Sequence, residues 1–412
     1  MNDSARTQSV LFKGLAPKPL TVRFEEERTS SDGGAILLKA ADERLGMISS
    51  MAASFTDRRD GSRVKHEIEE LLSQRIFGIA CGYEDGNDAA RIAADPVMKT
   101  LAGRDPFGED LGSQPSISRF ERSATRRDLF RMGTSLMKAV VRAQRRGRKG
   151  WAKRITIDLD QTPLSTYGGQ QLTFFNGHYD TYCYIPLVAA ISFAGEPDQY
   201  VVAGILRPGN APDKRGAISV LSRLLPLLRE AFPQAALAVR FDAGFCAPEI
   251  IDYVESEGLD YAIAFPGNAV LDRASAILMS EVRFLASKTG VTEHRYAETT
   301  YQAGTWPRER RVIFKGGHAN LRTRAKRQPE ICRHQHARLG SAHLRERLLP
   351  ARRLRESAQG VEERPRHGPH VVHLVPGQPV PRTHDHRGLR VVSGNPTVRH
   401  STRARHRVPT PH

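Results

Sequence analysis

The sequence predicts a mixed α/β fold, preceded by a helical region and followed by a tail of different character. Helical periodicity dominates residues 34–145, strand patterns dominate residues 154–315, and no aromatic residue follows Phe314 in the 412-residue chain. The four cysteines are widely spaced and form no Cys-x-x-Cys pair, which favours a reducing cytoplasm. The longest apolar run is about half of the ~20 residues that a membrane span needs, so no membrane partner is expected.

The net charge of +17 is distributed unevenly along the chain. Residues 316–412 hold 20 Lys and Arg against 6 Asp and Glu, whereas residues 1–315 carry an excess of only three positive charges. This tail also contains 12 of the 15 histidines and 10 of the 25 prolines, without helical or strand periodicity. Because such a segment buries too little apolar surface to offset its chain entropy, we expect residues 316–412 to be disordered.

Two explanations fit this basic tail. It is either a natural arm for nucleic acid or the product of a shifted reading frame. Natural arms are usually rich in Lys and poor in His, Pro and Val, unlike this segment. Since the composition changes abruptly near Lys315–Gly316 and does not return, we favour a frameshift at that point.

Most of residues 34–145 are predicted to be helical. One helix is indicated by apolar residues at helical spacing, namely Ile68, Leu71, Leu72, Ile76 and Ile79. The chain then breaks at Pro115, with Ser116 and Ser118 as candidate cap residues. A long basic helix is expected to follow.

The end of this basic helix carries the densest positive run in residues 1–315. The candidate DNA-binding residues in it are Arg142, Arg145, Arg146, Arg148 and Lys149. Such a run is either a solvated linker or a surface that contacts phosphates without reading the base sequence.

The pattern changes to strands at residue 154. Residues 154–160 alternate between polar and apolar side chains, so Asp158 and Asp160 lie together on one face of a strand. Residues 179–193 and 199–206 are predicted as the next two strands. The Gly-Glu-Pro-Asp turn between them indicates an antiparallel hairpin.

The following residues alternate between helices and strands. The predicted elements are a turn-rich loop at 206–216, a helix at 217–232, a strand at 237–242, a helix at 244–258, a strand at 259–266 and further β structure at 289–315. Pro226 is expected to interrupt the first of these helices. Three antiparallel strands followed by helix, strand, helix and strand predict a mixed sheet.

Asp160 and Asp242 each end a predicted strand and lie 82 residues apart. If both strands are central in one sheet, the two carboxylates converge. Mg²⁺ prefers such oxygen ligands, and two ions about 4 Å apart would activate the attacking hydroxyl and stabilise the leaving oxygen of a phosphoryl transfer. A strand-end Asp is also a common turn or cap residue, so spacing alone gives a weak signal.

Arg240 shares the alternating strand with Asp242. It either pairs with that acid or holds a DNA phosphate, and it is therefore a further candidate DNA-binding residue. The sequence does not distinguish these two roles.

Several longer motifs accompany the two acids. They are D-L-D-Q-T-P (158–163), Y-G-G-Q-Q-L (167–172), F-F-N-G-H-Y-D-T-Y-C-Y-I-P-L (174–187), L-R-P-G-N (206–210), R-F-D-A-G-F-C-A-P-E (240–249), T-S-S-D-G-G-A-I-L-L (29–38) and S-I-S-R-F-E (116–121). In this order they resemble the DDE transposases of bacterial insertion sequences, and more narrowly the insertion-sequence thirteen-eighty group. The resemblance covers roughly residues 20–315.

This resemblance implies a ribonuclease-H-like catalytic core at 151–315, in which residues 270–315 are the start of a β-rich insertion. It also implies a helical region at 1–150 that binds double-stranded DNA at the terminal inverted repeats of the element. It also implies strand cleavage and transfer with Mg²⁺ or Mn²⁺, and a homodimer in the transposition complex. Asp160 would be the first catalytic carboxylate and metal ligand, and Asp242 the second. Asp158 would either support Asp160 from outside the metal shell or replace it as the ligand.

The third carboxylate of the resembled family is a Glu in a motif of the Y-x-x-R-G-x-x-E-N-x-x-K-E-L kind. This sequence contains no such motif. Loss of one ligand should remove most metal affinity and turnover. We therefore expect a transposase that is inactive in this copy. The alternative is a catalytically dead DNA-binding remnant that occupies the element ends.

Overall fold

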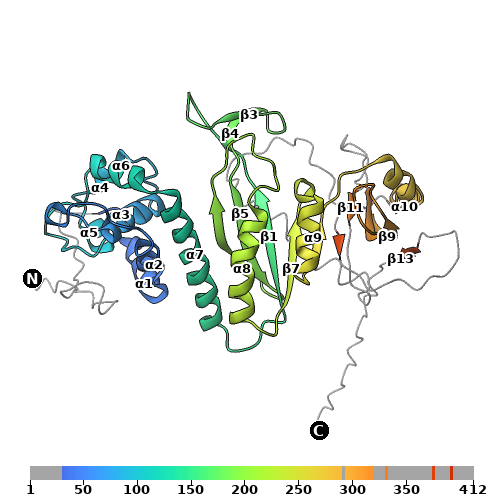
Figure 1. Ribbon diagram of the computed structural model, residues 1–412, viewed down its shortest axis with the longest axis horizontal. Coiled ribbons are helices and arrows are strands. Elements are labelled where there is room, and N and C mark those ends of the chain that lie inside the picture. Colours follow the sequence, from blue (N-terminus) through green and yellow to red (C-terminus); the bar gives the residue numbers. More distant parts are fainter. Residues whose placement is uncertain (1–29, 290–292, 319–329, 333–373, 376–389, 393–412) are drawn as a thin grey trace, which may run out of the picture.

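The structure is a computed structural model that describes residues 30–289, 293–318, 330–332, 374–375 and 390–392. Three parts follow one another across the molecule: a group of helices, a five-stranded sheet with flanking helices, and a second sheet beside a long helix (Figure 1). The predicted mixed α/β class is confirmed. None of the helices in the described part of the chain combines the length and apolar character that a bilayer crossing requires.

The first part is helical, as the periodicity predicts. Its helices are α1 (Ile36–Leu45), α2 (Met47–Ala52), α3 (Ile68–Ala80), α4 (Asp88–Ile92), α5 (Pro96–Leu101), α6 (Gln114–Ser123) and α7 (Arg126–Gly147). Phe77, Met98 and Leu101 are among the buried side chains that form its core. The helices before α7 therefore have a core of their own, whereas α7 contributes Met137, Val140 and Val141 to the core of the central sheet.

The long basic helix α7 begins later than the sequence predicts. The backbone N–H of Asp128 donates to the hydroxyl of Thr125, and the Asp128 carboxylate accepts from the Thr125 N–H at 3.0 Å. Ser116 and Ser118 are not caps, because they lie inside α6, which has Pro115 in its first turn. Proline is tolerated there because the first N–H groups of a helix have no partner within it.

The central sheet has the strand order β6-β5-β1-β7-β8. Its strands are β1 (Arg154–Gln161), β5 (Leu187–Phe193), β6 (Gln199–Ile205), β7 (Ala236–Phe241) and β8 (Asp260–Ile263). The strand β5 runs antiparallel to both neighbours, whereas β7 runs parallel to β1 and β8. The helices α8 (Ala217–Ala231) and α9 (Pro248–Ser256) form the crossover connections of the parallel strands. The predicted hairpin and helix-strand alternation are confirmed.

The prediction that Pro226 interrupts a helix is wrong. α8 continues through Pro226, which is exposed together with Ser222, the residue whose carbonyl loses its helical N–H donor. An internal proline costs about 3 kcal/mol, but each fully buried Leu contributes about 1.5–3 kcal/mol. α8 buries Leu221, Leu224 and Leu228 completely, and this burial outweighs the cost of the proline.

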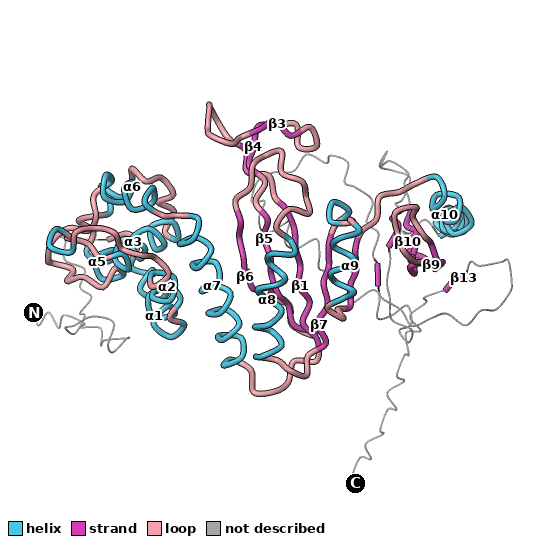
Figure 2. The backbone as a smooth tube through the Cα atoms, in the orientation of Figure 1, coloured by secondary structure: helices cyan, strands magenta, loops and turns pink. Residues whose placement is uncertain are grey.

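The predicted strand 179–193 is divided in two. Ile185 and Pro186 separate β4 (Thr181–Tyr184) from β5. β4 pairs with β2 (Leu164–Ser165) and β3 (Phe174–Asn176) in a small sheet. This small sheet, called the hairpin extension below, projects beyond the end of the central sheet at which β1 terminates (Figure 2).

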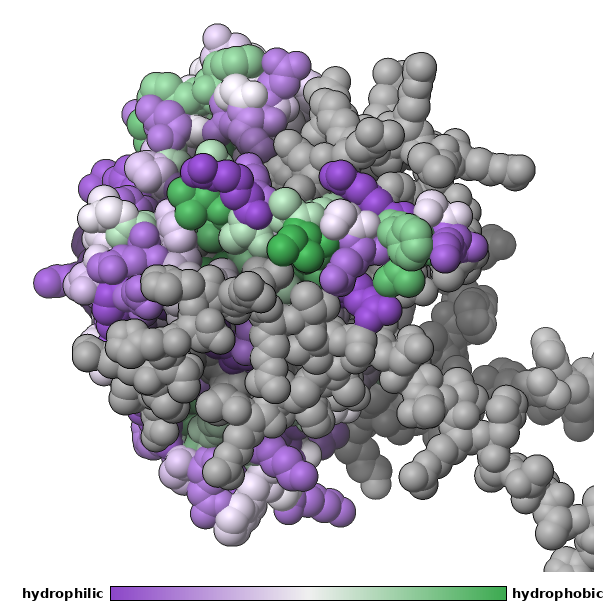
Figure 3. All heavy atoms as spheres, turned by 90° about the vertical axis from the view of Figure 1, so that its right-hand side faces the viewer, coloured by the Kyte–Doolittle hydropathy of each residue, from purple (hydrophilic) through white to green (hydrophobic). Residues whose placement is uncertain are grey.

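The third part contains α10 (Ala269–Thr289), β9 (Glu293–Tyr301) and β10 (Arg310–His318). The two strands confirm the predicted β structure near residue 300, but the expectation that a β-rich segment begins at residue 270 is wrong, because α10 occupies residues 269–289. The buried Arg310 ties β10 to α9 through Glu255, at 3.0 Å. Val270, Ile277 and Phe284 recur every seven residues on α10 and are more than half exposed. Figure 3 views this end of the molecule and shows apolar side chains at its surface.

The predicted disordered tail lies mostly outside the described residues. Three short strands within it are described, namely β11 (Glu330–Cys332), β12 (Leu374–Val375) and β13 (Arg390–Val392). They pair with β10 or β9. The frameshift near Lys315–Gly316 stays a prediction.

Candidate functional site

Asp160 and Asp242 lie at the ends of two neighbouring central strands. The register of β1 and β7 pairs Asp158 with Arg240 and Leu159 with Phe241. Asp242 follows β7 directly with an extended backbone (φ −78°, ψ −178°), so the next position in this register sets it beside Asp160. Neighbouring strands lie about 4.8 Å apart. The two acids are therefore adjacent at one edge of the sheet, which we call the acid edge.

Backbone N–H groups orient both carboxylates. Asp160 accepts from the N–H of Gln161 at 2.8 Å, and Asp242 accepts from the N–H of Gly244 at 3.0 Å. The second bond caps the short helix Ala243–Phe245 that follows β7. Both acids are only partly buried, so the acid edge borders solvent.

Asp158 and Arg240 form a buried ion pair on the same pair of strands. Two nitrogens of the Arg240 guanidinium donate to the Asp158 carboxylate: Nε to Oδ1, and Nη2 to Oδ2 at 2.7 Å. Asp158 is 4% exposed and Arg240 7%. A bidentate partner within the sheet therefore neutralises the charge of Arg240, and its assignment as a DNA-binding residue stays a prediction.

The loop between β6 and α8 closes around the acid edge through Arg207. This buried guanidinium donates to the carbonyls of Ile185, Pro212, Asp213 and Arg215 and to Oε1 of Gln161. Burial lowers the pKa of Arg207, and the nearby carboxylates of Asp213 and Asp242 oppose that shift. Arg207 therefore holds the loop, the end of β1 and the hairpin extension together.

Asp213 is an acid near this edge that the sequence reasoning missed. A Cβ added to Gly244 would collide with the Asp213 carboxylate, so Asp213 packs directly on the turn that follows Asp242. In the sequence it stands in a turn-rich loop, and the only available signal was that of a turn. Within the described residues, no three His, Cys, Asp or Glu side chains are arranged to hold a metal ion, so Asp213 does not complete a three-ligand site with the pair.

The hairpin extension presents aromatic side chains next to the acid edge. Phe175 and Tyr182 lie opposite each other on β3 and β4, with ring centroids 5.6 Å apart, and each is at least half exposed. Cys183, on the opposite face, is fully buried. Gly209 of the L-R-P-G-N motif is required there, because a Cβ would collide with the carbonyl oxygen of Cys183.

The predicted basic run is divided by the structure. Arg142, Arg145, Arg146 and Lys149 are exposed. Arg148 instead pairs with Glu196, with an Nη2–Oε2 distance of 2.6 Å, and lies 3.4 Å from the ring centroid of Phe193. These contacts fasten the end of α7 to the β5–β6 turn, and the phosphate contact of Arg148 stays a prediction.

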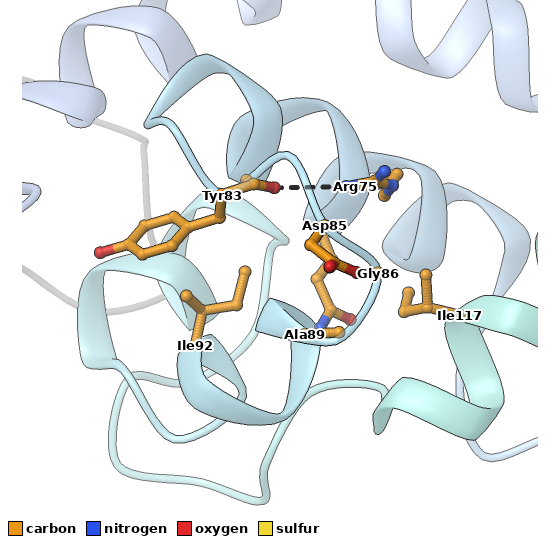
Figure 4. Close-up of a pocket in the computed structure, with 9 residues that line it drawn as sticks. Arg75, Tyr83, Asp85, Gly86, Ala89, Ile92 and Ile117 are labelled. Carbon is orange, nitrogen blue, oxygen red and sulfur yellow. Dashed lines mark hydrogen bonds between the residues drawn. The ribbon is translucent and has the colours of Figure 1, made fainter. Parts of the chain in front are cut away.

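One small hollow lies away from the acid edge, among α3, α4 and α6. Arg75 and Tyr83 line it with Asp85, Ala89 and Ile117 (Figure 4). Arg75 donates to the carbonyl of Tyr83 at 3.2 Å. The hollow measures about 10 Å³, which is about the space for one water molecule, so it is a packing gap and not a ligand site.

Residues 12–326 match the family model described as Transposase DDE domain group 1. This span is about three quarters of the chain and contains both strand-end acids, and the chain therefore belongs to this family of transposases. A search of curated proteins finds no match. Members of the family act on DNA in transposition and recombination, and DDE transposases generally use a divalent metal ion.

Proposed function

We propose that this protein derives from a bacterial insertion-sequence transposase of the thirteen-eighty group, with a ribonuclease-H-like core that acts at the element's terminal inverted repeats as a cytoplasmic homodimer. The observation that carries the proposal is the register of β1 and β7, which makes Asp160 and Asp242 neighbours. The sheet order, with β5 as the antiparallel strand between β6 and β1, supports the assignment of the core.

The acid edge offers suitable ligands for a divalent metal ion. Asp160 and Asp242 offer carboxylate oxygens, the donors that Mg²⁺ and Mn²⁺ prefer. Asp158 is neutralised by Arg240, which favours Asp160 as the ligand. When bound, the metal would activate a hydroxyl nucleophile and stabilise the leaving oxygen. The residues of this chain orient the two carboxylates through the N–H groups of Gln161 and Gly244.

We further propose that this copy is inactive, because a third carboxylate is missing. The described residues contain no three-ligand cluster, and no sequence motif supplies the expected Glu. The composition break near Lys315–Gly316 supports a frameshift as the cause.

A DNA-binding remnant is the alternative function. It is favoured by Arg142, Arg145, Arg146 and Lys149, which are exposed at the end of α7. Such a protein would occupy the element ends and exclude intact copies without cutting them.

The test compares the present chain with one whose reading frame is restored after codon 315. With Mg²⁺ or Mn²⁺ and a duplex that contains the element ends, the present chain should bind without nicking. The restored chain should nick, and Asp160→Asn or Asp242→Asn should abolish nicking on the order of a thousandfold or more. Full nicking by either restored variant would overturn the assignment of the acid edge.

A further inference from the structure

A line of cations runs along one side of α7. Its members are Arg127, Arg131, Lys138, Arg142 and Arg145. The intervals of four, seven, four and three residues place all five within an arc of about 60° around the helix axis. All five side chains are exposed. We call this set the cation stripe.

The cation stripe is not neutralised by the part of the protein that the structure describes. None of its five members has a carboxylate within ion-pair distance among the described residues. Other cations nearby are paired, such as Arg148 with Glu196 and Arg154 with Asp260. An exposed row of unpaired like charges costs free energy by self-repulsion, so its presence favours a function that uses the charge.

The stripe cannot turn inward, because the other sides of α7 are used for packing. Met137, Val140 and Val141 are buried, and α7 packs against β6, α8 and α2. The stripe therefore faces solvent along the length of a helix that is held on three elements.

The dimensions of the stripe suit a DNA backbone. From Arg127 to Arg145 it is about 27 Å long at 1.5 Å per residue. Each strand of duplex DNA carries one phosphate per 3.4 Å of axis, so the stripe spans about eight base pairs. A flat, flexible anion or a small phosphate ligand would use only a fraction of this length.

One end of the stripe lies at the end of the sheet that carries the acid edge. Only six residues separate the end of α7 from the start of β1, so the C-terminal end of α7 lies near the start of β1. Its N-terminal end lies toward the opposite end of the sheet, where β1 terminates at Gln161, and Figure 1 shows α7 running beside the sheet in this way. The helix packs on β6, which is two strands, or about 10 Å, from β1.

We propose that the cation stripe is a track for the phosphate backbone of a DNA duplex, read without regard to base sequence, and that Arg127, Arg131 and Lys138 belong to it with Arg142 and Arg145. The proposal rests on the proposed function for its partner, a duplex whose end reaches the acid edge. It does not depend on cleavage.

Arg126 and Arg127 provide a matched comparison. They are neighbouring exposed arginines on α7, but Arg126 lies about 100° from Arg127 around the axis. The full-length chain and its Arg126→Gln, Arg127→Gln, Arg131→Gln and Lys138→Gln variants are titrated with a fluorescent 30-base-pair duplex of arbitrary sequence, without divalent metal, between 50 and 300 mM salt. The 20 Lys and Arg of the tail contribute equally to every variant.

Each stripe variant should lower the slope of log affinity against log salt by about 0.9 and weaken binding about eightfold at 0.1 M salt. Arg126→Gln should change neither, and Lys138→Arg should restore the native slope. Equal effects of Arg126→Gln and Arg127→Gln, or no effect of either, would overturn the proposal. So would a stripe variant that changes the oligomeric state instead of DNA binding, since the stripe would then contact a second copy.

Failure of this test is distinguishable from failure of the proposed function. The binding assay contains neither divalent metal nor an element end, whereas the nicking assay contains both. An unchanged salt slope in the stripe variants, together with metal-dependent nicking by the restored chain, would keep the catalytic assignment and exclude the track.

Discussion

The acid edge and the cation stripe use charge in opposite ways. At the acid edge, the cations are buried and satisfied inside the protein, as in Arg240 with Asp158 and Arg207 with four carbonyl groups. On α7, the cations are exposed and lack carboxylate partners among the described residues. The comparison teaches that an arginine close to a catalytic edge is not for that reason a DNA contact, and that burial and pairing decide between the two roles.

The largest expected effect comes from breaking the buried pair. Asp158→Ala leaves the guanidinium of Arg240 buried without its partner and should destabilise the protein by about 3–5 kcal/mol. Chemical denaturation measures the loss. An Asp158→Leu/Arg240→Met double variant should recover much of it, because it removes both charges. If the Asp158→Ala variant were as stable as the unmodified protein, the pair would not be buried as described.

The next effect concerns the turn after Asp242. Gly244→Ala should destabilise the protein by about 1–3 kcal/mol, because the new methyl group collides with the Asp213 carboxylate. Gly267→Ala is the matched control, since its Cβ would meet no atom closer than 3.7 Å. Asp213→Ala should relieve part of the Gly244→Ala penalty in a double-mutant cycle. Equal stability of the two glycine variants would contradict the described contact.

A smaller effect separates two arginines of the predicted basic run. Arg148→Gln should lower stability by about 1 kcal/mol, because it loses Glu196 and the Phe193 ring, and leave the salt slope of DNA binding unchanged. Arg142→Gln should leave the stability unchanged and lower the salt slope of DNA binding. Thermal unfolding and the duplex titration together measure both variants. A lowered salt slope in Arg148→Gln would return this residue to the DNA-binding set.

The smallest effect concerns an exposed pair. The side-chain hydrogen bond from Arg59 lowers the pKa of Asp57 to about 2. Since the carboxyl titrates near 3.9 when unfolded, its contribution is present above that pH and is lost as the pH falls toward 2. The gain should stay within about 1 kcal/mol, because solvent screens the pair. Asp57→Asn should flatten this part of the acid-denaturation profile, and an unchanged profile would contradict the pairing.

The sequence predicts those parts of the acid edge that depend on local residue patterns. The alternation of residues 154–160 predicted a strand that carries Asp158 and Asp160 on one face, and the strand before Asp242 was also recognised. What the sequence lacked was the partner of each cation. Arg240 meets Asp158 across 82 positions and Arg148 meets Glu196 across 48, and such distances depend on how the strands align.

Two further misses also have tertiary causes. Pro226 did not end its helix, because burial of the apolar face of α8 outweighed the local preference. Asp213 gave only a turn signal, since its approach to Gly244 depends on the loop that Arg207 holds in place.

The central claim is that Asp160 and Asp242 are neighbours across β1 and β7. It is tested most directly by an Asp160→Cys/Asp242→Cys variant in a Cys246→Ser background, oxidised and mapped by mass spectrometry, because neighbouring strands bring two Cα atoms within the 4.4–6.8 Å that a disulfide needs. The account predicts a 160–242 cross-link in the folded protein and none for the Asp160→Cys/Ala238→Cys control. No 160–242 cross-link in a folded, oxidised sample would contradict it.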